Sequence, residues 1–325
     1  MKKYIIAIIV LLSSVMLALF IGNGAIESSG IIGAIFGNGT ETERLIVFQI
    51  RIPRILAAAG AGTALSVSGF LLQGSLDNRI ASPGILGINN GAGLFVLLSA
   101  LLFPFNPGVK CISAFVGALI VTVFVSLLSK GTGMSKTSVI LSGVAVSAVC
   151  VSIIDFIISA KPETVADKTA FQLGGFANVQ PVIVYLAVPV ILIVMILTVI
   201  LASGMDIIAL GDETAHGLGL NVKKYRWLCV LFAAILAGAA ISMSGIIGFV
   251  GLIVPNSIRV IFHVNSRGSV ILNAIYGASF LVLCDTIARI VAFPYELPCG
   301  LILSLIGAPF LITILIKKRK RLGVS

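Results

Sequence analysis

The sequence predicts an all-α membrane protein with about ten transmembrane helices and an inverted internal repeat. Composition, repeated apolar runs and one pair of similar segments lead to this prediction. Of the 325 residues, 58% are hydrophobic and only 10% are charged, against roughly 45–50% and about 25% in an ordinary soluble domain. A mean hydropathy of +1.17 excludes a soluble globule and a disordered chain. The composition therefore indicates a polytopic membrane protein.

Apolar runs long enough to cross a membrane recur along the whole chain. A bilayer core of about 30 Å needs roughly 20 apolar helical residues. Nine such runs are clear, and a tenth, over 245–263, is interrupted by Gly248, Gly251 and Pro255. The predicted spans are residues 4–22, 55–75, 85–104, 109–129, 137–159, 181–203, 227–243, 245–263, 269–292 and 299–316.

The distribution of charge favours the tenth span. Lys2 and Lys3 precede the first span, and five basic residues occupy 317–321 after the last. The positive-inside rule places both termini in the cytoplasm, which requires an even number of spans. Ten spans put fifteen of the 22 Lys and Arg residues inside and seven outside. Topology thus explains the positive charge, so the expected environment is a lipid membrane and no nucleic-acid partner is expected.

Two segments 176 residues apart are similar. The nine residues 61–69 and the nine residues 237–245 are identical at six positions, including the Ala-Gly pair and the final Ser-Gly. Five spans separate the two copies, so they cross the membrane in opposite directions, as in the inverted repeats of many transporters. The alternative is that small residues recur in any tightly packed membrane helix.

The loop at 204–226 is long, amphipathic and predicted to be cytoplasmic. Asp212, Glu213 and Thr214 follow Gly211 as a helix start, where carboxylates favour the positive end of the helix dipole. The helix continues through Ala215 and is predicted to end at Gly217 and Gly219. A short helix at the membrane face has the shape of a docking element for another subunit; the alternative is a connector without a partner.

Residue patterns for catalysis, metals or cofactors are absent from the sequence. It has no Gly-x4-Gly-Lys-Ser/Thr phosphate loop, and His216 and His263 are far apart, so neither an enzyme nor a metal or cofactor site is expected. The five cysteines are widely spaced and indicate core residues. Asp155 and Asp285 lie in predicted spans, where acids are costly. They support a rival function, a proton-coupled secondary carrier, although Asp285 is four residues before Arg289 and is expected to pair with it.

Several segments, in order over 51–310, resemble the FecCD family, the permease subunits of ATP-binding-cassette importers for iron-siderophore, haem and cobalamin complexes. The segments that carry the resemblance are Arg51-Ile-Pro-Arg54, Ser68-Gly-Phe-Leu-Leu-Gln-Gly74, Ser82-Pro-Gly-Ile-Leu-Gly87, Leu210-Gly-Asp-Glu-Thr-Ala215, Gly248-Phe-Val-Gly-Leu-Ile-Val-Pro255, Asp285, Ala288-Arg289, Glu296-Leu-Pro298 and Ile306-Gly-Ala-Pro-Phe310.

The resemblance implies a single transmembrane permease domain over 1–325, in the cytoplasmic membrane of a bacterium. It implies a second permease copy, identical or paralogous, cytoplasmic ATP-binding subunits that hydrolyse ATP, and an extracytoplasmic substrate-binding protein. Arg51, Arg54 and Arg289 match the positions that engage acids of the binding protein, and the loop containing Gly211–Gly219 matches the helix that contacts the ATPase. Thr137 and Ser138 match the position that narrows the cytoplasmic end of the pathway.

The resemblance leaves the substrate open. An iron chelate, either a ferric siderophore or haem, is the expected cargo, and cobalamin is the alternative. The separate binding protein holds most of the specificity in such importers, so this chain does not distinguish among these ligands.

Overall fold

The computed structural model describes residues 2–22, 28–103, 106–131, 135–162, 171–292 and 295–321. The main elements of this part of the chain are helices. In chain order they are α1 (Lys2–Phe20), α2 (Ser28–Phe36), α3 (Glu41–Leu45), the π-helix η1 (Ile46–Arg51), α4 (Ile52–Ser75), α5 (Ile88–Leu102), α6 (Pro107–Lys130), α7 (Lys136–Ala160), α9 (Pro181–Leu201), α10 (Ser203–Ile208), α11 (Asp212–Gly217), α12 (Val222–Ser244), α13 (Val250–Ile261), α14 (Ser266–Ile290) and α15 (Cys299–Arg321).

The helices coincide with the ten predicted spans. Among the described residues, seven helical segments are long and apolar enough to cross a membrane, and Ile88–Leu102, Val250–Ile261 and Cys299–Phe310 are shorter apolar helices. The interrupted span is shorter than predicted, because 245–263 is helical only over Val250–Ile261. Gly245 ends α12 with a φ of 68°, and the backbone N–H of Ile246 then donates to the carbonyl of Phe171. The chain therefore runs 245–249 without a helix before α13 begins.

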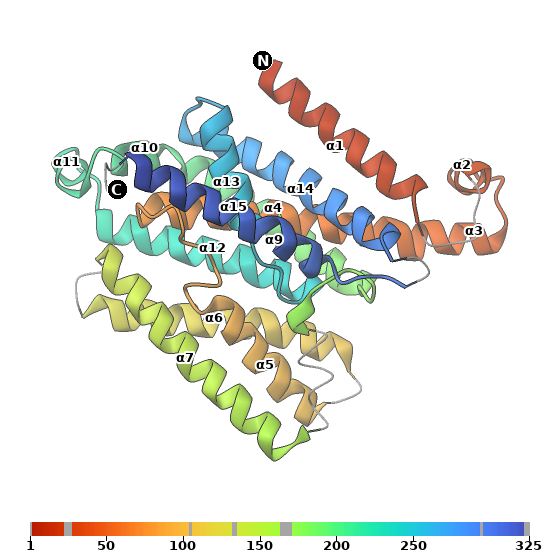
Figure 1. The fold of residues 1–325 in the computed structure, drawn as a ribbon, viewed down its shortest axis with the longest axis horizontal. Coiled ribbons are helices and arrows are strands. Elements are labelled where there is room, and N and C mark those ends of the chain that lie inside the picture. Colours follow the sequence, from red (N-terminus) through yellow and green to blue (C-terminus); the bar gives the residue numbers. More distant parts are fainter. Residues whose placement is uncertain are drawn as a thin grey trace.

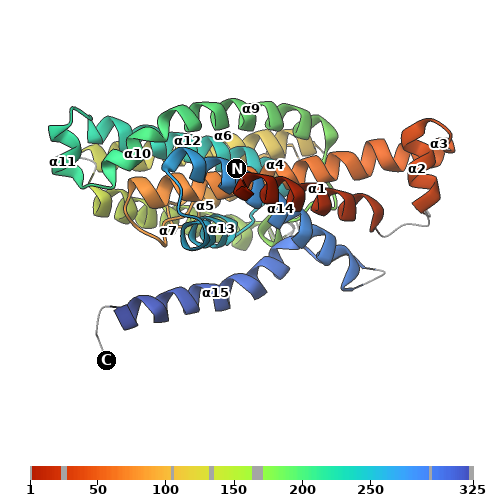
Figure 2. The same ribbon diagram turned by 90° about the horizontal axis from the view of Figure 1, so that it is seen from above.

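Helices α4 and α12 form the centre of the bundle and pack against each other (Figure 1). They run in opposite directions, which is the orientation that the inverted repeat predicts. On one side α4 contacts α14, which in turn contacts α1; on the other side α12 contacts α6, which contacts α5 and α7. Helix α9 covers α12 and α4, while α15 diverges from the bundle on the opposite side (Figure 2).

The two similar segments make close contacts with helices of the opposite half. A Cβ at Gly62 of α4 would lie 2.2 Å from the carbonyl oxygen of Gly277 in α14. A Cβ at the matching Gly238 of α12 would lie 3.1 Å from the ring of Phe115 in α6. Glycine lets two helix backbones approach in this way. The repeat thus has a packing role.

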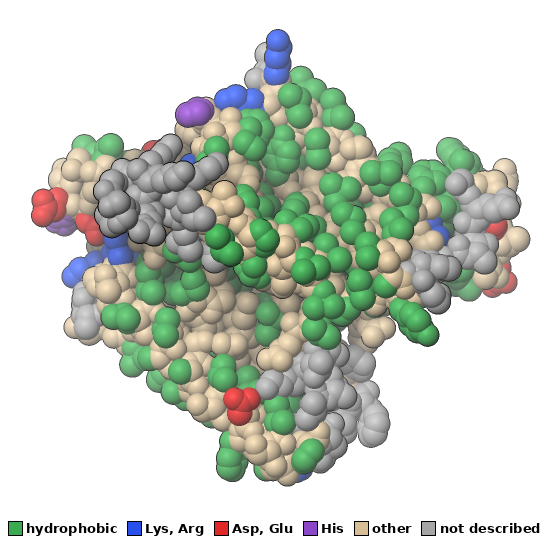
Figure 3. Space-filling view, viewed as in Figure 1, with side chains coloured by type: hydrophobic (Ala, Val, Ile, Leu, Met, Phe, Trp, Pro, Cys, Tyr) green, Lys and Arg blue, Asp and Glu red, His purple; other side chains and the backbone are tan. Residues whose placement is uncertain are grey.

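Large apolar side chains cover the outer face of the bundle (Figure 3). On α9, which lies on the opposite side of the bundle from the face in Figure 3, Ile193, Ile196 and Ile200 are 59%, 63% and 65% exposed. A soluble monomer does not expose apolar surface on this scale, so these faces suit lipid. The molecule is a multi-pass membrane protein.

The bundle has two ends, called here the α11 end and the η1 end. At the α11 end, the Lys3 ammonium donates to the carbonyl of His263 at 3.2 Å, and α15 finishes at the same end (Figure 1). Both ends of the helical chain therefore lie on one side, as an even number of crossings requires.

Candidate functional sites

A cluster of three arginines and two carboxylates lies at the η1 end. It consists of Arg51 from η1, Arg54 from α4, Asp285 and Arg289 from α14, and Glu296 from the segment before α15. We call it the arginine cluster. Arg54 is its centre: Nε and Nη2 each donate to Asp285 at 2.9 Å, and Nη1 donates to Glu296 at 2.8 Å. A guanidinium fork on one carboxylate is the strongest geometry for such a pair.

The other two arginines tie the end of α1 to the cluster. Arg289 Nε lies 3.3 Å from Asp285 Oδ2, so the predicted i,i+4 pair is confirmed. The Nη atoms of Arg289 donate to the carbonyl of Ala18 at 3.3 and 3.4 Å, and Arg51 donates to the carbonyl of Leu19. The last turn of α1 therefore has bonds to both arginines.

Burial is the feature of this cluster that the sequence did not reveal. Arg51, Arg54 and Arg289 are 6%, 8% and 4% exposed, and carboxylates of the chain itself hold two of them. The sequence places Asp285 near Arg289, but Arg54 is 231 residues from Asp285, and no local pattern signals that pair. In this conformation the predicted docking arginines also fasten α1, α4 and α14 together.

The predicted helix in the loop at the α11 end is present. Helix α11 begins at Asp212, directly after Gly211 with a φ of 105°, and ends at Gly217. Gly219 follows with a φ of 87°, and the N–H of Leu220 closes the turn on the carbonyl of Ala215 at 3.0 Å. Both glycines adopt left-handed conformations that favour glycine. Glu213 and Thr214 are exposed on this helix, whereas Ala215 is fully buried.

A second ionic group, called here the loop anchor, holds α11 against the bundle. It comprises Ser75 at the end of α4, Asp77 after α4, Lys136 of α7, Asp212 of α11 and Arg226 of α12. Arg226 is 2% exposed; its Nη2 donates to both oxygens of Asp212 at 3.0 and 2.9 Å, and its Nε donates to the carbonyl of Ser75 at 3.0 Å. One buried side chain thus joins the loop to the ends of both central helices.

Lys136 links this anchor to the start of α7. Its ammonium lies 3.2 Å from Asp77 and 4.0 Å from Asp212. Thr137 and Ser138 follow directly, in the first turn of α7, where the N–H of Ser138 donates to the Ser135 side chain. The structure therefore brings the predicted gate residues close to the predicted coupling helix, a proximity that their separation in sequence does not reveal.

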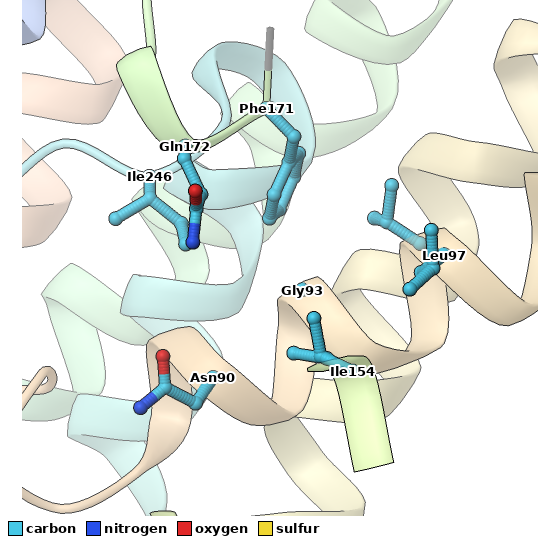
Figure 4. Close-up of a pocket in the computed structure, with 8 residues that line it drawn as sticks. Asn90, Gly93, Leu97, Ile154, Phe171, Gln172 and Ile246 are labelled. Carbon is cyan, nitrogen blue, oxygen red and sulfur yellow. The ribbon is translucent and has the colours of Figure 1, made fainter. Parts of the chain in front are cut away.

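A cavity of about 560 Å³ opens at the α11 end between α4, α10, α13 and α14. Its lining includes Gln73, Met205, Arg259, His263 and Asn273. A second cavity, between α5, α7 and residues 171–172, has a volume of only about 20 Å³, room for about one water molecule. Figure 4 shows Asn90, Phe171 and Gln172 around it.

Comparison with known proteins gives a consistent result. The model of the FecCD transport family matches residues 8–317. The chain is 35% identical over 321 residues to the Fe(3+)-citrate import system permease protein YfmD of Bacillus subtilis, covering 98% of this chain and 96% of the relative. It is 34% identical to the hemin transport system permease protein HmuU of Yersinia pestis, covering 85% and 84%.

The fold also matches a solved structure of an inward-facing ABC transporter assigned to the metal-chelate type. The TM-score is 0.87 at 24% sequence identity, and the match covers 97% of this chain and 99% of the other. At this identity the match concerns the fold.

Proposed function

Because the chain belongs to the FecCD transport family, we propose that it is the permease subunit of an ATP-binding-cassette importer that carries an iron chelate across the cytoplasmic membrane of a bacterium. The match over nearly the full length of an Fe(3+)-citrate permease is the observation that carries the proposal. Haem is an equally suitable cargo, since a hemin permease is almost as similar, and cobalamin remains the alternative. The whole chain, 1–325, acts as one transmembrane domain.

The α11 end is proposed to face the cytoplasm. Lys136, Arg226 and Arg259 lie at this end together with Lys3, and basic residues favour the cytoplasmic side of a membrane. The arginine cluster then faces the extracytoplasmic side.

Helix α11 is proposed to receive the cytoplasmic ATPase. Its exposed surface includes Glu213, Thr214 and Gly217, while Ala215 packs inward. The loop anchor supports the proposal, because Nη2 of the buried Arg226 donates to both carboxylate oxygens of Asp212 and so holds α11 against the bundle. A movement of the ATPase would then be transmitted through α11 to α4, α7 and α12. Thr137 and Ser138, at the start of α7, would gate the cytoplasmic end of the pathway.

The ATPase contact has a direct test. The N–H of Ala215 donates to the carbonyl of Gly211 at 2.9 Å, so Ala215→Pro removes this bond inside α11, at a cost of roughly 3 kcal/mol. We expect the variant to insert normally, to lose copurification of the ATPase and to lose transport. Normal transport by a well-expressed variant would identify the loop as a passive connector.

Arg51, Arg54 and Arg289 are proposed to receive acidic residues of the substrate-binding protein. Arg51 offers the cleanest test, because its recorded bond goes to a backbone carbonyl and not to a carboxylate that holds the bundle together. Arg51→Gln removes the charge and keeps a polar amide at this position. We expect weaker docking of the binding protein with unchanged protein yield; equal docking at low and physiological salt would exclude Arg51.

A second permease copy is proposed to complete the pathway. The two cavities described above are a cleft confined to one end and a space for about one water molecule, so neither accommodates passage of a large chelate through the bundle. An identical or paralogous copy would enclose the pathway between two chains. Cross-linking of membranes that contain the complete importer should give a permease dimer.

The decisive experiment compares energy sources. Reconstituted with its ATPase and binding protein, the permease should import ferric citrate or haem only when ATP is supplied. The rival function, a proton-coupled carrier using Asp155 or Asp285, should run on a proton gradient alone. The forked bond of Arg54 to Asp285 argues against Asp285 as a mobile proton site. Uptake driven by the gradient without ATP would refute the importer.

A further inference from the structure

The two carboxylates of the arginine cluster hold Arg54 in different ways. Asp285 receives two bonds from Arg54, lies within 3.3 Å of Arg289 and has a side chain only 4% exposed. Glu296 receives one bond, from Arg54 Nη1, and its side chain is 29% exposed. Asp285 is fixed within the long helix α14, whereas Glu296 lies outside the helices, between Ile290 and Cys299. One carboxylate is built into the bundle, and the other is accessible at its end.

The arginine cluster carries a net positive charge. Three guanidinium groups face two carboxylates, and Arg51 is only 6% exposed while donating to the neutral carbonyl of Leu19. Arg289 Nε, in the part of the chain that is described, has no hydrogen-bond partner of suitable geometry. Such a site attracts a further carboxylate from outside. An incoming carboxylate meets Glu296 first, because Asp285 is covered.

We propose that Glu296 is an internal substitute for a partner carboxylate: it occupies Nη1 of Arg54 until an Asp or Glu side chain of the substrate-binding protein displaces it, while Asp285 keeps Arg54 in place. The proposal rests on the proposed docking function of the arginines. It explains how arginines that are buried in the free permease can engage an acidic partner without leaving Arg54 unpaired inside the bundle, which would be costly.

The proposal predicts that loss of one carboxylate raises the affinity of the permease for the binding protein. Removing an exposed ionic competitor should strengthen docking, although the substitution takes away a residue of the docking site itself. Exposed ion pairs are typically worth up to about 1 kcal/mol, so Glu296→Gln should bind the partner roughly two- to fivefold more tightly. The matched control is Glu41→Gln: Glu41 is an exposed carboxylate of α3, at the same end, whereas the carboxylates that hold Arg54 are Asp285 and Glu296.

The binding experiment uses the permease–ATPase complex in lipid nanodiscs, with the substrate-binding protein that copurifies from the native membrane as the probe. A tighter dissociation constant for Glu296→Gln but not for Glu41→Gln supports the exchange. Equal or weaker binding by Glu296→Gln, combined with weaker binding by Arg51→Gln, overturns the exchange and leaves the docking function intact. Unchanged binding by all three variants overturns both.

A second measurement needs no partner. Phenylglyoxal modifies accessible arginines, and mass spectrometry locates the adducts. If Glu296 shields Arg54, then Glu296→Gln and Glu296→Ala should each accelerate modification of Arg54 severalfold, while the rate at Arg226, in the loop anchor, stays constant. Equal rates at Arg54 in the wild type and both variants would overturn the proposal, whatever the docking result.

Discussion

The arginine cluster and the loop anchor are both built around one buried arginine, but they fasten different things. Arg54 joins two transmembrane helices through a carboxylate that is 4% exposed, whereas Arg226 joins a transmembrane helix to a surface loop through a carboxylate that is 43% exposed. In the first arrangement little water reaches Asp285, so water does not replace a lost partner there. In the second, water has access on one side.

The two pairs therefore have different roles. The pair of Arg54 and Asp285 holds transmembrane helices together, and we call it part of the framework; the pair of Arg226 and Asp212 links α11 to that framework. A buried ion pair that loses one partner leaves an uncompensated charge, which typically costs about 3–5 kcal/mol, while water compensates much of the loss at a half-exposed pair. Damage to the pair of Arg54 and Asp285 should therefore appear first as lost stability. Damage to the loop anchor should appear first as lost communication with the ATPase.

The largest expected effect comes from Asp285→Asn. Arg54 and Arg289 would then share only Glu296 as a nearby carboxylate, so two buried cations lose their common partner. We expect the free energy of unfolding to fall by about 3–5 kcal/mol, measured as a lower midpoint in thermal unfolding of the purified protein. Asp155→Asn, which alters an exposed acid of α7, is the control. Similar midpoints for the two variants would contradict the assignment of Asp285 to the framework.

A smaller effect should follow from Gly62→Ala, which acts on the framework without touching its charges. The added methyl would meet the carbonyl of Gly277 at 2.2 Å, so α4 and α14 must move apart. Overpacking of this kind typically costs about 1–3 kcal/mol, and separation of the helices would also strain the pair between Arg54 and Asp285.

Gly60→Ala is the matched control for that substitution. Its Cβ would meet a terminal methyl of Val188 at 3.4 Å, close to ordinary contact, and alanine favours the helix over glycine. We expect an unchanged or slightly higher unfolding midpoint. A loss as large as that of Gly62→Ala would show that helix α4 tolerates no substitution in this region, whatever its contacts.

The smallest expected change in stability is that of Asp212→Asn. Arg226 keeps its bond to Ser75, and water reaches the half-exposed loop, so we expect a loss of about 1 kcal/mol. Transport should nevertheless fall more than ATP hydrolysis, because the ion pair with Arg226 no longer holds α11. The measurement is the ratio of substrate imported to ATP hydrolysed in proteoliposomes. Glu41→Gln, which removes an exposed acid of α3 at the opposite end of the bundle, should leave that ratio unchanged.

Several features of the molecule could be predicted from the sequence because they depend on local composition. The spans follow from runs of apolar residues, which must be helical in a bilayer to satisfy their backbone groups. The bounds of α11 follow from its glycines, because Gly211 directly precedes the helix and Gly219, two residues after its end, turns the chain away from it. The i,i+4 pair of Asp285 with Arg289 follows from helix geometry alone.

One error shows where local composition is insufficient. The tenth span was predicted to begin at 245, yet α13 begins at Val250. Residues 245–249 are apolar, but Ile246 bonds to Phe171, and a Cβ at Gly245 would lie 2.6 Å from the carbonyl oxygen of Phe171. Hydropathy records that a residue avoids water; it does not record which backbone group satisfies its N–H.

The sequence by itself determined that the chain crosses the membrane about ten times, that two of its segments run in opposite directions and that a short helix lies in the loop before α12. Only the tertiary structure decided the partners of the arginines. Arg54 reaches Asp285 across 231 residues, and Arg226 reaches Ser75 across 151. The physical reason is that such pairs form where close packing brings helices together, as at Gly62 and Gly277, and the composition around either partner does not indicate which helices meet there.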